Sequence, residues 1–211
     1  MIPMTTDVLF SLYGSHNEAT WPAPLLGYVL CIVALLMAFR PFPGSSRAIA
    51  AILATFWLWN GAVFHIGFFA PLNWGALIFG VFFILEGLLL LWLGLMRNRL
   101  DFRLTGEWRD PGDLALLAVA FAYPNLDLFA GHLWPQMQLP GTLPAPTVLA
   151  TFAFLLMARG RGARVLSIIP LLWALVGGAA ALSLGIWQDV AMAALTIAAA
   201  VLLFPSRATE R

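Results

Sequence analysis

The most regular feature of the sequence is a series of long apolar stretches separated by short polar ones. A helix that crosses a bilayer needs roughly 20 mainly apolar residues, and seven stretches approach or reach that length. The predicted spans cover residues 24–39, 48–68, 72–96, 114–133, 146–158, 165–184 and 188–204. The pattern therefore predicts an all-α fold, a polytopic transmembrane helix bundle with seven spans.

Both flanks of the bundle are short. Residues 1–22 are mildly amphipathic and carry Trp21, which favours a segment lying along the membrane interface. We expect this interfacial segment, then a single transmembrane domain over residues 23–205, then a tail over residues 206–211. The fifth span is short and is preceded by Pro140, Pro144 and Pro146. We expect it to begin below the surface, with the loop 134–145 folding back over the bundle.

Composition supports a membrane protein. The chain of 211 residues is 62% hydrophobic and 10% charged, with a mean hydropathy of +0.90. A soluble domain is nearer half apolar and a quarter charged. We therefore expect the lipid bilayer as the main partner and a multi-pass protein of the cell inner membrane. The net charge of +1 gives no general attraction to nucleic acid.

Positive charge is confined to alternate connections. All eleven basic residues are arginines. They are Arg40 and Arg47 in the first connection, Arg97, Arg99, Arg103 and Arg109 in the third, Arg159, Arg161 and Arg164 in the fifth, and Arg207 and Arg211 in the tail. Cytoplasmic loops carry an excess of basic residues. The alternation predicts an odd number of spans, with the N-terminus outside and the C-terminus in the cytoplasm.

Polar residues gather towards the predicted outer side. His65 and His132 end two of the spans, Asp127 lies below His132, and Asp189 begins the last span; Asn17 and Asn73 lie at the same level. Converging histidine and carboxylate groups can bind a metal or a polar solute. The spacing contains no HxxxH or HExxH motif, so a divalent metal at His65 and His132 is one reading among several. The plainer alternative is that these side chains face water.

Glu86 lies within the apolar run of the third span. A charge there costs at least ~2.5 kcal/mol on insertion scales, so the side chain must be protonated, paired or in contact with a wet cavity. Gly80, Gly87 and Gly94 recur at heptad spacing beside it, and small residues at one recurring position let another helix approach closely. Glu86 should therefore point into the bundle, either as a neutral hydrogen-bonding group or as part of a path for protons or solutes.

Some chemistry is excluded by missing residue types. Retinal is held on a lysine Schiff base, and the chain has no lysine. The single cysteine, Cys31, can form neither an intrachain disulfide nor a cysteine-based metal site. Walker, Rossmann and nucleophile-elbow patterns are absent.

Several short motifs together resemble a bacterial domain-of-unknown-function family of small polytopic membrane proteins. The motifs are NEATWP from Asn17, HIGFFAPLN from His65, GHLWP from Gly131, PAPT from Pro144, IPLLW from Ile169 and QD at Gln188. The resemblance implies that one shared outer-surface feature includes Asn17, Trp21, His65, Asn73, His132, Pro146, Thr147 and Asp189. The family often has Pro-Cys-Pro-Thr where this chain has Pro144-Ala145-Pro146-Thr147, which weakens any thiol-based role.

The hypothesis that follows is a non-enzymatic membrane protein that binds or passes a small polar solute or ion. His65, His132, Asp127 and Asp189 would form an outer-facing polar pocket, with Glu86 deeper on the path. Two alternatives stay open. One is a membrane-embedded, hydrolase-like metal enzyme that uses the same histidines as ligands. The other is an accessory subunit of a larger membrane complex, and a homo-oligomer is also compatible with the sequence.

Overall fold

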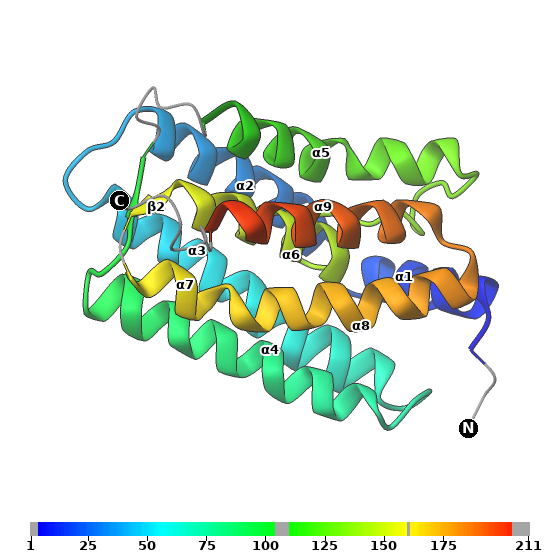
Figure 1. Ribbon diagram of the computed structural model, residues 1–211. Helices are drawn as coiled ribbons and strands as arrows, with labels where there is room; N and C mark the ends of the chain where they lie inside the picture. The colour runs from blue at the N-terminus through cyan, green and yellow to red at the C-terminus, as the bar shows by residue number, and fades with distance from the viewer. Residues whose placement is uncertain (1–3, 104–109, 160, 204–211) are drawn as a thin grey trace.

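The computed structural model describes residues 4–103, 110–159 and 161–203, and these residues form a helical bundle (Figure 1). Its helices are α1 (Thr6–Ala19), α2 (Ala23–Phe39), α3 (Ser45–Trp59), η1 (Asn60–Phe69), α4 (Ala76–Leu90), η2 (Leu91–Met96), α5 (Asp110–Phe129), α6 (Pro144–Met157), α7 (Arg161–Leu166), α8 (Ile168–Leu184) and α9 (Trp187–Leu203). The segments η1 and η2 are π-helices that continue α3 and α4. Two strands of two residues each, β1 (Asp101–Phe102) and β2 (Ala158–Arg159), pair antiparallel.

The all-α prediction is confirmed, and several helices suit a membrane. Among the described residues, three helical segments are long and apolar enough to cross one: Ser45–Phe69, Ala76–Met96 and Gly162–Leu184. Thr6–Ala19 and Ala23–Phe39 pass the same test only as a pair that is bent by 87°. Leu114–Phe129 and Pro144–Met157 are shorter apolar helices. Each predicted span overlaps a helix. The lengths of the helices, however, support a multi-pass protein with three or four spans.

The short helix α6 forms the centre of the bundle. Every one of its residues from Pro144 to Met157 is buried, and it packs against α5, α8 and α9. Pro144 and Pro146 occupy its first turn, where a missing N–H costs nothing. The loop before it is also inside the bundle, since Gln138 and Leu143 are 0% exposed. The helix therefore begins inside the bundle, and its depth relative to a membrane surface stays a prediction.

Small residues let α4 lie close against α3 and η1. A Cβ atom on Gly80 would come within 2.7 Å of Ile66, and one on Gly94 within 2.4 Å of Ala50. Such distances leave no room for a side chain, so the glycine seam predicted from heptad spacing is confirmed. The seam fixes which side of α4 meets α3, and it turns the neighbouring face, which carries Glu86, towards the interior.

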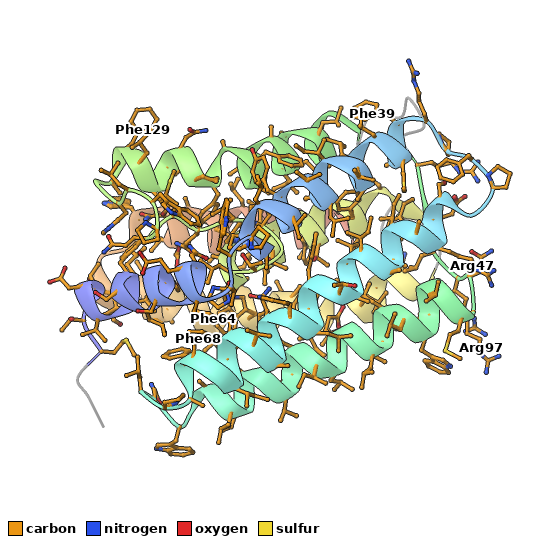
Figure 2. All side chains as sticks on the ribbon, turned by 180° about the vertical axis from the view of Figure 1, so that it is seen from behind. Phe39, Arg47, Phe64, Phe68, Arg97 and Phe129 are labelled. Carbon is orange, nitrogen blue, oxygen red and sulfur yellow. The ribbon has the colours of Figure 1, made fainter. Side chains whose placement is uncertain are left out.

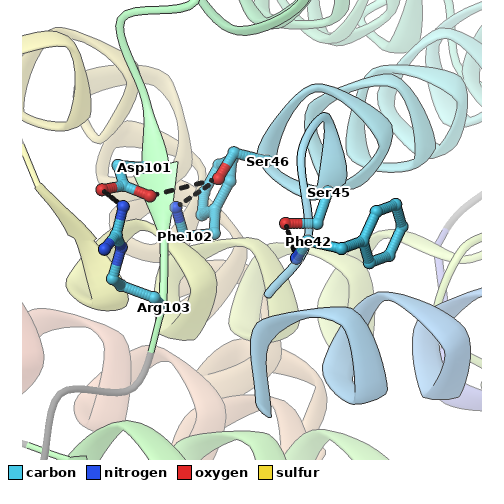
Figure 3. A network of polar contacts seen from close by, with 6 residues as sticks. All are labelled: Phe42, Ser45, Ser46, Asp101, Phe102 and Arg103. Atoms are coloured by element: carbon cyan, nitrogen blue, oxygen red, sulfur yellow. Dashed lines mark hydrogen bonds and ion pairs between the residues drawn. The ribbon is translucent and has the colours of Figure 1, made fainter. Parts of the chain in front are cut away.

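The two ends of the bundle differ in charge. Arg47 and Arg97 lie at one end and Phe129 lies towards the other (Figure 2). At the arginine end, Arg103 pairs with Asp101, and Asp101 accepts a hydrogen bond from Ser46 Oγ at 3.3 Å (Figure 3). The opposite end holds α1 and the turn between α8 and α9 (Figure 1). Thr6 Oγ1 ties α1 to this turn by donating to the carbonyl of Leu184 at 2.7 Å.

Candidate functional site

A cavity of about 360 Å³ lies at the end of the bundle that holds α1. We call it the outer cavity, because the arginine pattern of the sequence predicts that this end faces outward. Its lining comes mainly from α1, η1, the start of α4, α8 and the start of α9. Its lining is Met4, Leu9, Tyr13, Phe64, Phe69, Asn73, Phe79, Pro144, Trp173, Val176, Gly177, Ala180, Ala181, Ser183, Leu184, Ile186 and Asp189. Apolar and aromatic side chains dominate this set, and Asp189 brings a carboxylate into it.

Asp189 is held in position by neutral hydrogen-bond donors. It lies in the first turn of α9 and is 8% exposed. Its Oδ1 accepts from the hydroxyl of Tyr123 at 2.7 Å and from the side-chain amide of Gln138 at 3.1 Å. Both bonds reach the same oxygen, so the carboxylate is anchored on one side while Asp189 still lines the cavity.

Asp127 belongs to the same hydrogen-bond network, one step further from the cavity. Its Oδ1 accepts from the side-chain amide of Gln188 at 3.0 Å, and its Oδ2 accepts from the backbone N–H of Gln138. Gln138 therefore bridges the two carboxylates and fixes the buried loop between α5 and α6. We call Tyr123, Asp127, Gln138, Gln188 and Asp189 the carboxylate network; it joins helices α5 and α9 to that loop.

His65 lies directly behind the aromatic wall of the cavity. It belongs to the π-helix η1. The N–H of Ala70 donates to the carbonyl of His65 at 2.8 Å, which is the i→i+5 hydrogen bond of a π-helix. Its ring centroid lies 4.7 Å from that of Phe83 and 5.2 Å from that of Trp173. His65 is 0% exposed, and neither of its ring nitrogens nor Nε1 of Trp173 has a hydrogen-bond partner among the described residues. Buried polar atoms without partners are costly, and here that cost is carried by the aromatic cluster around His65 and Trp173.

Glu86 is fully buried, as its sequence context predicts. Phe79, Phe83 and Glu86 are spaced i, i+4, i+7 on α4, so they share one helix face. Phe79 lines the outer cavity, whereas Glu86 does not and lies two turns further towards the arginine end. Within the described chain, neither of its carboxylate oxygens has a hydrogen-bond partner.

A second, smaller hollow of about 190 Å³ lies between α4 and α8, and we call it the lateral groove. It is lined by Ile78, Phe79, Phe82, Phe83, Ile169, Leu172, Trp173 and Val176. Three of these residues, Phe79, Trp173 and Val176, also line the outer cavity. Ile78 is 53% exposed and Leu172 is 49% exposed, so the groove reaches the apolar outer surface of two helices long enough to span a membrane.

Four other predicted site residues frame this end of the bundle without lining the cavity. His132 stacks on Phe10 with ring centroids 3.4 Å apart. Asn17 donates through Nδ2 to the carbonyls of Pro135 and Met137 at 2.6 and 2.8 Å. Exposed Trp21 packs against Trp134 with ring centroids 5.4 Å apart. Thr147 Oγ1 accepts from the N–H of Gly141 at 2.8 Å and donates to the carbonyl of Leu143 at 2.7 Å.

The predicted single polar pocket is thus divided in the structure. Asp189 and Asn73 line the outer cavity, and Asn73 Oδ1 also accepts from the N–H of Gly75 at 3.0 Å. Asp127 joins Asp189 through Gln138, whereas His65 sits in an aromatic setting of its own. The cavity itself is mainly apolar, because the side chains of the carboxylate network turn towards one another.

The metal reading of the sequence stays a prediction. Across the described ranges, no three His, Cys, Asp or Glu side chains come together in a group that could hold a metal ion. His65 is surrounded by aromatic rings, and Nδ1 of His132 makes a hydrogen bond of 3.4 Å with Oε1 of Gln136. Catalytic zinc usually has three protein ligands, so these surroundings give the two histidines no further ligand.

Several residues of the site were not predicted from the sequence, and Tyr13, Trp173 and Gln138 are three of them. Tyr13 and Trp173 line the cavity, and Gln138 bridges the two carboxylates. Tyr13 had one available signal, since it lies on the apolar side of an amphipathic segment. No sequence pattern around Gln138 predicts its role, because that role depends on the loop entering the bundle.

Comparison with known proteins gives one match. No curated protein and no solved structure shows significant similarity to the chain. A family model described as a family of unknown function, DUF6064, matches residues 6–211, which supports the resemblance drawn from the short motifs. Because the match covers nearly the whole chain, this protein belongs to the DUF6064 family of unknown function.

Proposed function

We propose that this protein is a multi-pass membrane protein that binds a small solute in the outer cavity. The observation that carries the proposal is the cavity itself. Its volume of about 360 Å³ falls within the ~300–1,000 Å³ of small-molecule sites. Such sites are mainly apolar and aromatic, with a few polar groups that fix the ligand's orientation, and Tyr13, Asn73 and Asp189 supply such groups here.

The proposal places the cavity at the outer face of the membrane. Leu9 and Tyr13 of α1 line the cavity, and α1 lies at the end of the bundle away from Arg47 and Arg97 (Figures 1 and 2). Because basic residues are retained on the cytoplasmic side, the arginine end would face the cytoplasm. The seven predicted spans and an inner-membrane location are part of the same proposal.

Passage of the solute across the membrane is the second element of the proposal. Ionisable side chains within membrane spans often mark solute or proton paths, and Glu86 shares a helix face with the cavity residue Phe79. Phe83 lies between them on that face and packs against His65. A solute that leaves the cavity towards the cytoplasm would therefore pass Phe83 before it reaches Glu86.

Filling the cavity with a large side chain should abolish binding. Ala179 and Ala180 are both exposed, but only Ala180 belongs to the cavity lining. Benzyl alcohol, an aromatic ring with one hydroxyl, serves as the probe in protein reconstituted in nanodiscs. We expect saturable shifts of the methyl NMR signals of Leu184, a lining residue, and their loss in Ala180→Trp but not in Ala179→Trp.

Partition of the probe into lipid is controlled within the same spectrum. Leu182 is 68% exposed and lies outside the cavity, so its methyl signals report only the surrounding lipid. The proposal is wrong if Leu184 and Leu182 shift alike and without saturation, or if Ala180→Trp leaves the response of Leu184 unchanged.

A further inference from the structure

We infer that the solute is an organic cation, an ammonium group on an apolar body, and this inference rests on the proposed binding function. Three separate features lead to it. They are a carboxylate network whose described partners are all neutral, a cavity wall of aromatic rings, and a groove that reaches the lipid-facing surface.

The first feature is the balance of charge. Asp127 and Asp189 accept hydrogen bonds from Tyr123, Gln138 and Gln188, and none of these donors carries a positive charge. Among the described residues, one arginine forms an ion pair: Arg103 pairs with Asp101, at the other end of the bundle. Burying a carboxylate without an opposite charge is costly. A cation in the cavity beside Asp189 would supply that charge.

The second feature is the chemistry of the wall. Five aromatic side chains line the cavity: Tyr13, Phe64, Phe69, Phe79 and Trp173. The face of an aromatic ring attracts a cation, and cages of such rings are used to hold quaternary ammonium groups. A small inorganic ion would gain little from so much apolar surface. An alkylated ammonium group gains from the rings and from the carboxylate together.

The third feature is the lateral groove. It shares Phe79, Trp173 and Val176 with the cavity and continues along α4 and α8 to Ile78, which is exposed on the outside of the bundle. Its lining consists of apolar and aromatic side chains. A ligand can therefore place its charged group near Asp189 and its apolar body along Phe79 and Trp173, towards the bilayer.

A pair of probes with the same shape separates charge from size. Phenyltrimethylammonium and tert-butylbenzene differ only in the central nitrogen or carbon atom and thus in charge. We expect phenyltrimethylammonium to saturate the Leu184 methyl shifts at a concentration at least tenfold lower than tert-butylbenzene does. In Asp189→Asn this preference should fall below threefold. In the control Asp101→Asn, which removes a carboxylate at the arginine end, the preference should be unchanged.

An anionic probe tests the inference in the wild-type protein, so the result does not depend on whether a variant folds. In the wild-type protein, 4-tert-butylbenzoate should bind at least tenfold more weakly than phenyltrimethylammonium, because the Asp189 carboxylate repels it. Equal binding of the cation, the neutral probe and the anion would overturn the inference and leave the proposed binding function intact. Failure of every probe to give a saturable shift at Leu184 would instead count against the binding function itself.

Discussion

Replacing Gly141 with alanine is expected to lower the free energy of unfolding by about 2–6 kcal/mol. Gly141 has a φ of +99°, a conformation that side chains with a Cβ rarely adopt. A Cβ atom there would lie 2.9 Å from Gly27 Cα and 2.9 Å from a ring carbon of Phe56. The free-energy costs of backbone strain and of overpacking therefore add. Both destabilise the loop that carries Gln138 into the carboxylate network.

Gly131 provides the matched control for Gly141. Its φ is +90°, but a Cβ atom there would meet nothing within 4 Å. Gly131→Ala should therefore show only the backbone cost of about 1–2 kcal/mol. Thermal unfolding in detergent compares the two variants under the same conditions. Equal losses of stability would mean that the loop is not packed between α2 and α3.

Replacing Asp127 with leucine is expected to cost about 2–6 kcal/mol, because it leaves two buried neutral donors unsatisfied at about 1–3 kcal/mol each. Asp127 accepts from the backbone N–H of Gln138 and from the side chain of Gln188 at 3.0 Å. Both donors would stay buried without an acceptor. The measurement is thermal unfolding together with hydrogen exchange of the Gln138 amide, which should become faster.

Two further substitutions show whether this cost comes from the network. Asp127→Asn keeps the shape and one acceptor oxygen, so it should lose about half as much stability as Asp127→Leu. Asp101→Asn removes a carboxylate that is 40% exposed, and an exposed ion pair contributes only about 0–1 kcal/mol. If Asp127→Leu cost no more than Asp101→Asn, the loop would not depend on Asp127.

Much of the fold could be predicted from the sequence because the dominant signal is the length of apolar runs. Each predicted span overlaps a helix, and the arginine-free connections lie at the end of the bundle with α1. Pro140, Pro144 and Pro146 indicated an unusual start for α6, and the helix begins inside the bundle. Glycines at heptad spacing identified the face of α4 that lies closest to another helix.

The site was harder to predict, for a physical reason. In a membrane helix, both the side facing lipid and the side facing the core are apolar, so hydrophobic periodicity does not show which residues converge. His65 illustrates the problem. It ends up among the rings of Phe83 and Trp173 rather than in the carboxylate network, and the π-helical turn that orients it has no sequence signature. The central role of Gln138 depends on contacts over a distance of 51 residues along the chain.

The most direct test of the central claim, a cavity that is open to the outside and binds cations, is thiol labelling of Ala180→Cys in intact cells. Native Cys31 is fully buried and should stay silent. We predict that trimethylammonium-ethyl methanethiosulfonate labels Ala180→Cys from outside. Saturating phenyltrimethylammonium should slow this reaction at least fivefold, without slowing labelling of Ser15→Cys, an exposed position of α1 outside the cavity lining. Failure of the reagent to reach Ala180→Cys from outside, or labelling that phenyltrimethylammonium does not slow, would contradict the account.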